Sequence, residues 1–175
     1  MATNNRTGSL MIESLVAISI TLVSLLGIFA LLSQSIALNK NASQKFVAVY
    51  LAAEGIEIAR SIVDANYTAS TYPSSTSWNS GINNGSFELG YDSDVSALDL
   101  SKDLGGLSAT PLNIDAGSGI YGYGAGQPTP FMRTVIISTP NASDHEIKVV
   151  SLVQWPERGA LQSVSLEDHF FNWRP

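Results

Sequence analysis

The chain has 175 residues, nine basic and fifteen acidic side chains, and a formal net charge of −6 at pH 7. Its length predicts one domain with an appendage, and the absence of cysteine excludes disulfides, thiolate zinc sites and cysteine nucleophiles. The acidic balance argues against a nucleic-acid partner.

The first recognisable element is an apolar run near the N-terminus. Residues 14–39 carry no charge, and residues 1–8 before the run are polar. As a helix, residues 14–32 alone extend about 28 Å, close to the hydrocarbon thickness of about 30 Å. We therefore predict a membrane-spanning helix over residues 9–38. The alternatives are a secretory signal peptide, whose apolar region is shorter, and a buried core helix, which would not be apolar on every face.

Glu13 is the unusual residue of this segment, because it stands at the entrance of the apolar span. A carboxylate beside hydrocarbon is costly and marks a candidate functional site. The span contains no Lys or Arg to pair with it. A free α-amine created by cleavage nearby would supply the missing cation, and the small residue Gly8 precedes the apolar run.

The string Gly8-Ser9-Leu10-Met11-Ile12-Glu13 and the apolar run after it resemble the N-terminal signal of type IV pilins and type II secretion pseudopilins. The resemblance implies that residues 1–8 are a leader peptide, removed by a prepilin peptidase between Gly8 and Ser9. It further implies that the new amine of Ser9 is N-methylated. Glu13, the fifth residue of the mature chain, would then pair with the amine of a neighbouring subunit during assembly.

Two features depart from the common pattern of that family. Ser9 stands where the first mature residue is usually Phe or another large apolar residue. No proline occurs before Pro73, whereas major pilins usually carry one inside the apolar helix. The second departure fits a minor pilin or a pseudopilin better than a major pilin.

Residues 39–64 are predicted to continue the helix as an amphipathic half. Residues 51–60 resemble the segment that follows the membrane helix in many bacterial pilin-like proteins. The predicted apolar face consists of two rows, one of Phe46, Val49, Tyr50, Ala53, Ile56, Arg60 and Val63, the other of Val47, Leu51, Ile58 and Ile62. Glu54, Glu57, Ser61 and Asp64 mark its polar edge.

The remainder divides into a variable region over residues 65–130 and an antiparallel β-meander over residues 131–175. The Gly- and Ser-rich variable region predicts loops with short strands, one at residues 86–91 and a weak one at 112–114 or 119–123. Three alternating segments predict the meander: residues 131–138, 145–155 and 161–171, the second with Val149, Ser151, Val153 and Trp155 on one face. Residues 153–159, 164–166 and 172–173 resemble the C-terminal hairpin of minor pilins and pseudopilins. The predicted fold class is α+β, with a long N-terminal helix packed on a C-terminal antiparallel sheet, as in pilins.

Other candidate sites are weak. Asp92, Asp94 and Asp99 offer oxygen ligands for calcium but lack EF-hand spacing, so a solvated acidic loop is favoured and no metal or cofactor is predicted. Tyr121 and Tyr123 are suited to stacking on a sugar or base, although packing is the simpler interpretation. The pairs Asp144–His145 and Asp168–His169 lack the context of known hydrolase motifs. No catalytic residue is assigned, and the chain is predicted not to be an enzyme.

The sequence therefore favours a structural subunit, a minor pilin or pseudopilin that is assembled into a type IV pilus or a type II secretion pseudopilus. Its expected location is the cytoplasmic (inner) membrane, crossed once, with the C-terminal domain outside the cytoplasm, and afterwards the filament. Expected partners are other pilin or pseudopilin subunits, the prepilin peptidase and the assembly machinery. The alternatives are an adhesin-like binding module at a filament tip or on a membrane anchor, and a membrane-anchored hydrolase that depends on His145 or His169.

Overall fold

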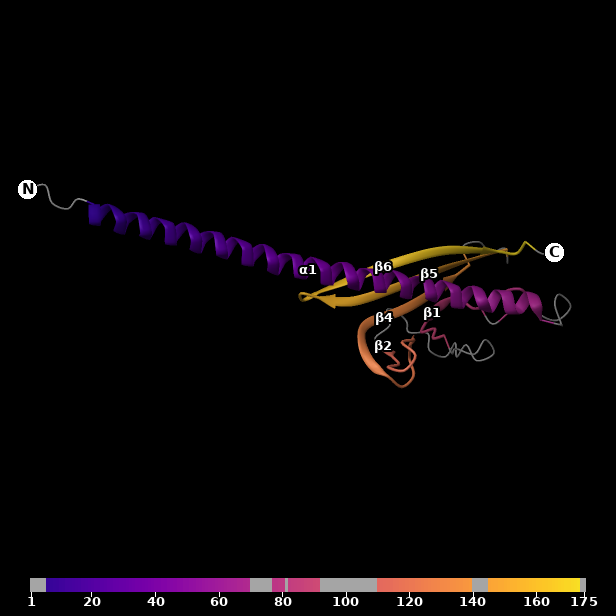
Figure 1. Cartoon of the computed structure of the whole chain (residues 1–175). Helices are drawn as coiled ribbons and strands as arrows, with labels where there is room; N and C mark the ends of the chain where they lie inside the picture. The colour runs from indigo at the N-terminus through magenta and orange to yellow at the C-terminus, as the bar shows by residue number, and fades with distance from the viewer. Residues whose placement is uncertain (1–5, 70–76, 81, 92–109, 140–144, 174–175) are drawn as a thin grey trace, which may run out of the picture. The chain divides into compact units, whose positions relative to one another are not determined.

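The computed structural model describes residues 6–69, 77–80, 82–91, 110–139 and 145–173. These residues form two compact units, Met1–Gln44 and Lys45–Pro175, called here the first and the second unit. The elements in chain order are α1 (Arg6–Thr68), β1 (Gly85–Phe87), β2 (Pro111–Ile114), β3 (Tyr121–Gly122), β4 (Gln127–Ser138), β5 (Glu146–Glu157) and β6 (Ala160–Phe171) (Figure 1). The predicted α+β class is confirmed, with a long N-terminal helix packed on an antiparallel sheet.

The sheet has the order β3-β2-β4-β5-β6, and β1 also pairs with β4. Strands β4, β5 and β6 form the predicted meander with continuous antiparallel register. Both weak segments of the variable region are strands, β2 and β3, and they pair with each other. The strand predicted at residues 86–91 is shorter, because only Gly85–Phe87 pairs with β4.

A two-residue turn, Arg158-Gly159, joins β5 to β6. Arg158 and Gly159 have φ angles of 48° and 81°, and Glu157 pairs directly with Ala160. Positive φ at both central residues is the type I′ geometry, whose twist matches that of the flanking strands. The turn thereby fixes the register of the whole hairpin.

The core of the second unit lies between the later part of α1 and one face of the sheet. The predicted inward face of β5 is confirmed, since Val149, Ser151, Val153 and Trp155 are all buried. The structure divides the buried apolar residues into two clusters, both of which contain residues of α1. The first includes Ile62, Tyr67, Trp78, Leu89, Val135, Val149 and Phe170. The second consists of Ala48, Leu51, Ala52, Leu112, Phe131, Val153 and Trp155. These contacts hold the helix on the sheet, since burial of apolar surface is the main favourable term in folding.

The predicted apolar face of the helix is partly wrong. Phe46 and Tyr50 are 68% and 75% exposed, whereas Ala48 and Ala52 are fully buried. Small side chains let the helix backbone approach the sheet closely, so the contact stripe is set by size as well as by hydrophobicity. Gly55 continues this stripe: a Cβ atom there would lie 2.4 Å from Ser151 Oγ.

Candidate functional site

The apolar part of α1 in the first unit presents its side chains outward on every side of the helix. From Leu10 to Ile36 every residue is exposed, including Ile18, Phe29 and Leu31 at 60–69%. The candidate membrane span in this helix has a mean hydropathy of 2.7, and none of it is buried. Within the described part of the chain, α1 is the one helix long and apolar enough to cross a membrane.

Four hydroxyl groups of this span are satisfied by the helix itself. Ser14, Ser19, Thr21 and Ser24 each donate a hydrogen bond to the main-chain carbonyl three or four residues earlier, at 2.8–2.9 Å. Such bonds remove the cost of placing a hydroxyl in hydrocarbon, where water is absent. These four residues are therefore compatible with an apolar surrounding.

Glu13 is an exposed residue of α1 and makes no ion pair with any described residue. Because α1 begins at Arg6, the predicted cleavage position between Gly8 and Ser9 lies in its first turns. Ser9 and Glu13 are four residues apart, so they share one face of the helix and differ by about 6 Å in height.

The second unit contains one polar group that the sequence analysis missed. Arg133 is fully buried, donates hydrogen bonds to the carbonyl oxygens of Leu51 (3.1 Å) and Leu89, and forms an ion pair of 3.1 Å with Glu54 Oε2. It thus ties α1 to β4 and to the segment after β1. The sequence signal for the burial of Arg133 is the alternation of the strand, which places Arg133 on the inward face with Phe131 and Val135.

The two tyrosines considered for stacking are packing residues. Tyr123 donates a hydrogen bond of 2.9 Å from its hydroxyl to the carbonyl of Arg133. Burial raises the pKa of Tyr123 to about 12. Tyr121 packs against the second hydrophobic cluster. Both residues therefore support the sheet rather than forming an open stacking platform.

His169 is held between two carboxylates on the exposed face of the sheet. Its Nδ1 lies 2.6 Å from Glu146 Oε1 and its Nε2 lies 3.1 Å from Glu167 Oε1, and these hydrogen bonds raise the pKa of the imidazole. Asp168 is paired with Arg60 of α1 instead. The two side chains considered as an acid–base pair thus point to opposite faces of β6, as strand alternation requires.

The remaining candidates are only partly covered by the structure. Asp92, Asp94, Asp99 and Asp144 lie outside the described residues, and His145 is exposed in the turn before β5. Among the residues that are described, no group of three His, Asp or Glu side chains is arranged to hold a metal ion.

Comparisons with protein-family models, with curated proteins and with solved structures found no match to this chain. The assignments at Gly8, Ser9 and Glu13 therefore rest on the sequence resemblance and on the position of these residues in α1.

Proposed function

We propose that this chain is a pilin-like structural subunit, a minor pilin or a pseudopilin. A prepilin peptidase cuts between Gly8 and Ser9 and methylates the amine of Ser9. The apolar part of α1 then holds the subunit in the cytoplasmic membrane with a single pass, and the second unit lies outside the cytoplasm. From there the subunit is assembled with other pilins or pseudopilins into a type IV pilus or a type II secretion pseudopilus.

The observation that carries the proposal is the position of Glu13 at the start of the apolar part of α1, where residues 14–39 carry no charge. Glu13 has no cationic partner among the described residues, and the next charge along the chain is Lys40. A carboxylate buried without a partner costs several kcal/mol, whereas a pair with good geometry removes most of that cost. The only cation that processing creates close to the span is the amine of Ser9.

The requirement for a partner also explains how a single carboxylate determines the register in which two subunits assemble. When two apolar helices slide past each other, their dispersion contacts change little with register. A buried ion pair between Glu13 of one subunit and the Ser9 amine of the next forms in one register only. Glu13 is therefore a specificity device in the helix contact, a well-supported use of buried polar groups.

Processing is tested by co-expression with an active prepilin peptidase, followed by intact-mass and N-terminal peptide analysis. We expect loss of residues 1–8 and one methyl group on the amine of Ser9. A Gly8→Val variant is the matched control and should keep its full length, because the small residue at the cut is lost. If the wild-type chain stays intact while the same peptidase cuts a known pilin, the proposal is wrong.

Assembly is tested with disulfide cross-linking, since the chain has no cysteine of its own. A Ser24→Cys variant places a thiol in the middle of the apolar helix and reports subunit contacts in native membranes that contain the assembly machinery. Adding Glu13→Gln should leave cleavage intact and reduce the cross-linked fraction, whereas Glu13→Asp should retain part of it. Equal cross-linking with and without the Glu13 carboxylate would refute its role in assembly.

A second candidate function is the adhesin-like binding module, and one observation favours it. The second unit has an open pocket with exposed aromatic residues where α1 passes the end of β6. This pocket can be tested separately from processing.

A further inference from the structure

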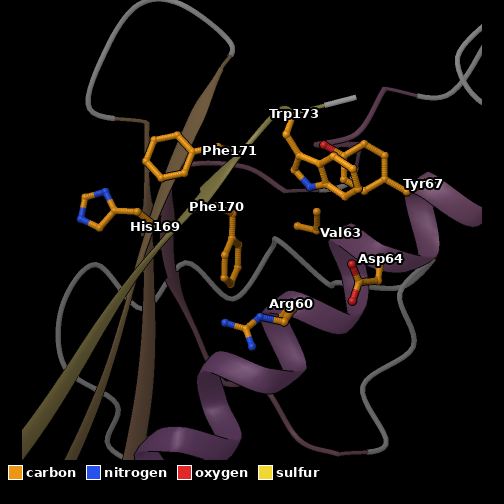
Figure 2. A pocket seen from close by; sticks show the side chains of 8 residues that line it. All are labelled: Arg60, Val63, Asp64, Tyr67, His169, Phe170, Phe171 and Trp173. Atoms are coloured by element: carbon orange, nitrogen blue, oxygen red, sulfur yellow. The ribbon is translucent and has the colours of Figure 1, made fainter. Parts of the chain in front are cut away.

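The second unit carries an open pocket of about 290 Å³. The later turns of α1 form one wall, and the end of β6 with the residues after it forms the other (Figure 2). Its lining residues are Arg60, Val63, Asp64, Tyr67, His169, Phe170, Phe171 and Trp173. Figure 2 shows Phe170 between helix and strand, whereas His169 and Phe171 point to the other side of β6. The space beside the helix is thus bounded by Asp64, Tyr67, Phe170 and Trp173.

The rim of this pocket is aromatic and held in place. Trp173 is 69% exposed, and its ring centroid lies 6.0 Å from that of Tyr67. Tyr67 stacks in turn on the buried Trp78, at 6.4 Å between centroids. Tyr67 is itself buried, so it supports Trp173 from below. An exposed Trp side chain on a fixed support is typical of the few residues that dominate protein–protein contacts.

The pocket lining contains one negative charge, that of Asp64, which no described residue pairs with. Arg60 lies over the Phe170 ring, 5.7 Å from its centroid, but its guanidinium already pairs with Asp168 and with Glu57. Asp64 is exposed one turn further along α1 and forms no ion pair with a described residue. Besides the paired Arg60 and His169, a ligand that enters the pocket therefore meets the Asp64 carboxylate, which no described residue pairs with, and the exposed ring of Trp173.

We propose that this pocket binds a cationic side chain, arginine or lysine, of a partner protein. The charged head pairs with Asp64, and the exposed Trp173 ring contacts its planar or methylene part, an arrangement favoured within about 6 Å of a ring centroid. A volume of about 290 Å³ is at the lower end of the range for small-molecule sites, so it suits a side chain better than a cofactor. This inference goes beyond the proposed function and does not depend on cleavage.

The test is made on the full, unprocessed chain in an uncharged maltoside detergent that contains no choline group. The probe is the peptide acetyl-Gly-Arg-Gly-amide, and its citrulline counterpart is the neutral control of the same shape. Trp173 is the one exposed tryptophan of the three in the chain, so its emission reports occupancy, with calorimetry as a second measurement. We expect the arginine peptide to bind and to change the emission, and the citrulline peptide to bind more weakly.

Substitutions locate the site. Asp64→Asn and Trp173→Ala should each weaken binding of the arginine peptide by about two- to fivefold. The matched control is Glu157→Gln, which also removes one negative charge but lies at the opposite end of the β5–β6 hairpin. It should leave the affinity unchanged, and added salt should weaken binding to the wild-type chain.

Several outcomes would overturn the inference: no binding of the arginine peptide, equal binding of the citrulline peptide, or an Asp64→Asn variant that binds like the wild type. Equal losses in Asp64→Asn and Glu157→Gln would show general attraction to an acidic chain and would also refute it. Because the unprocessed chain is used, such a failure says nothing about cleavage at Gly8–Ser9, and a failure of cleavage leaves the pocket as it is.

Discussion

Gly55 offers a sharp test of how closely α1 approaches the sheet. A Cβ atom at this position would lie 2.4 Å from Ser151 Oγ, 3.1 Å from Val135 Cγ2 and 3.2 Å from Arg133 Cδ. In an exposed helix, Gly→Ala stabilises by about 1 kcal/mol, because alanine loses less backbone entropy. Overpacking of a filled core costs about 1–3 kcal/mol. We therefore expect Gly55→Ala to lower the free energy of unfolding by about 0–2 kcal/mol.

Ser151 makes the argument more specific, because its Oγ is buried and has no hydrogen-bond partner among the described residues. Ser151→Ala removes the closest clashing atom and an unsatisfied hydroxyl, so alone it should be neutral or stabilising. Combined with Gly55→Ala it should restore stability, with a coupling of about 1 kcal/mol.

The assay is denaturant unfolding in detergent, followed by the fluorescence of the two buried tryptophans. Gly27→Ala is the matched control, since a Cβ atom at Gly27 would meet nothing within 4 Å. It should leave the unfolding of the second unit unchanged. If Gly55→Ala stabilises by the full 1 kcal/mol expected for an exposed helix, or if the two substitutions are simply additive, the close approach is refuted.

Two further predictions concern ionised groups. Arg133→Leu should lower the free energy of unfolding by about 2–4 kcal/mol, because Glu54 and two carbonyl oxygens lose their donor, whereas Glu54→Gln should cost only about 1–2 kcal/mol in the same assay. Equal losses would contradict this order. Glu146 and Glu167 raise the pKa of His169 above its usual value, so its stabilising contribution is complete below about pH 6.5 and is lost as the pH rises through the raised pKa. The stability difference between wild type and His169→Asn should therefore shrink between pH 6 and pH 9 in thermal unfolding, and a difference that grows with pH would refute the assignment.

The C-terminal meander could be predicted because its strands alternate with period two over long stretches. Val149, Val153 and Trp155 recur at every second or fourth position, and all three are buried. Strands β2 and β3 were harder, since segments of two to four residues among glycines give too short a pattern. They form because β4 offers its free edge to β2, which is a long-range effect that local sequence does not report.

The errors on the helix and at Arg133 have one cause. Phe46 and Tyr50 have larger apolar side chains than Ala48, but around Ala48, Ala52 and Gly55 the helix contacts the sheet through small residues, where the backbone comes closest. The same closeness brings the Leu51 carbonyl within reach of Arg133 and so supplies one acceptor for its buried guanidinium. The distance between the helix backbone and the sheet therefore determines which side chains are buried. The proposed role of Glu13, in contrast, requires a second molecule. Only the position of Glu13 in the sequence indicates this role.

The last prediction concerns the independence of the second unit. Both hydrophobic clusters lie within residues 45–175, as do all the ion pairs found among the described residues. A chain that begins at Lys45 loses no cluster residue and exposes only the four N–H groups of a new helix start, so its free energy of unfolding should fall by about 1 kcal/mol.

A chain that begins at Ala53 is the contrasting case, because it also loses Ala48, Leu51 and Ala52 from the second cluster. It should be less stable by at least another 2–5 kcal/mol, the usual cost of truncating one large buried side chain. Near-ultraviolet circular dichroism and denaturant unfolding compare the two chains. If the chain from Lys45 is unfolded, or both are equally stable, the division into units is wrong. If the expected order is found, residues 10–38 contribute nothing to the fold of the second unit. Their exposed apolar side chains then have no role in that core, and the length and hydropathy of the segment are those of a candidate membrane span.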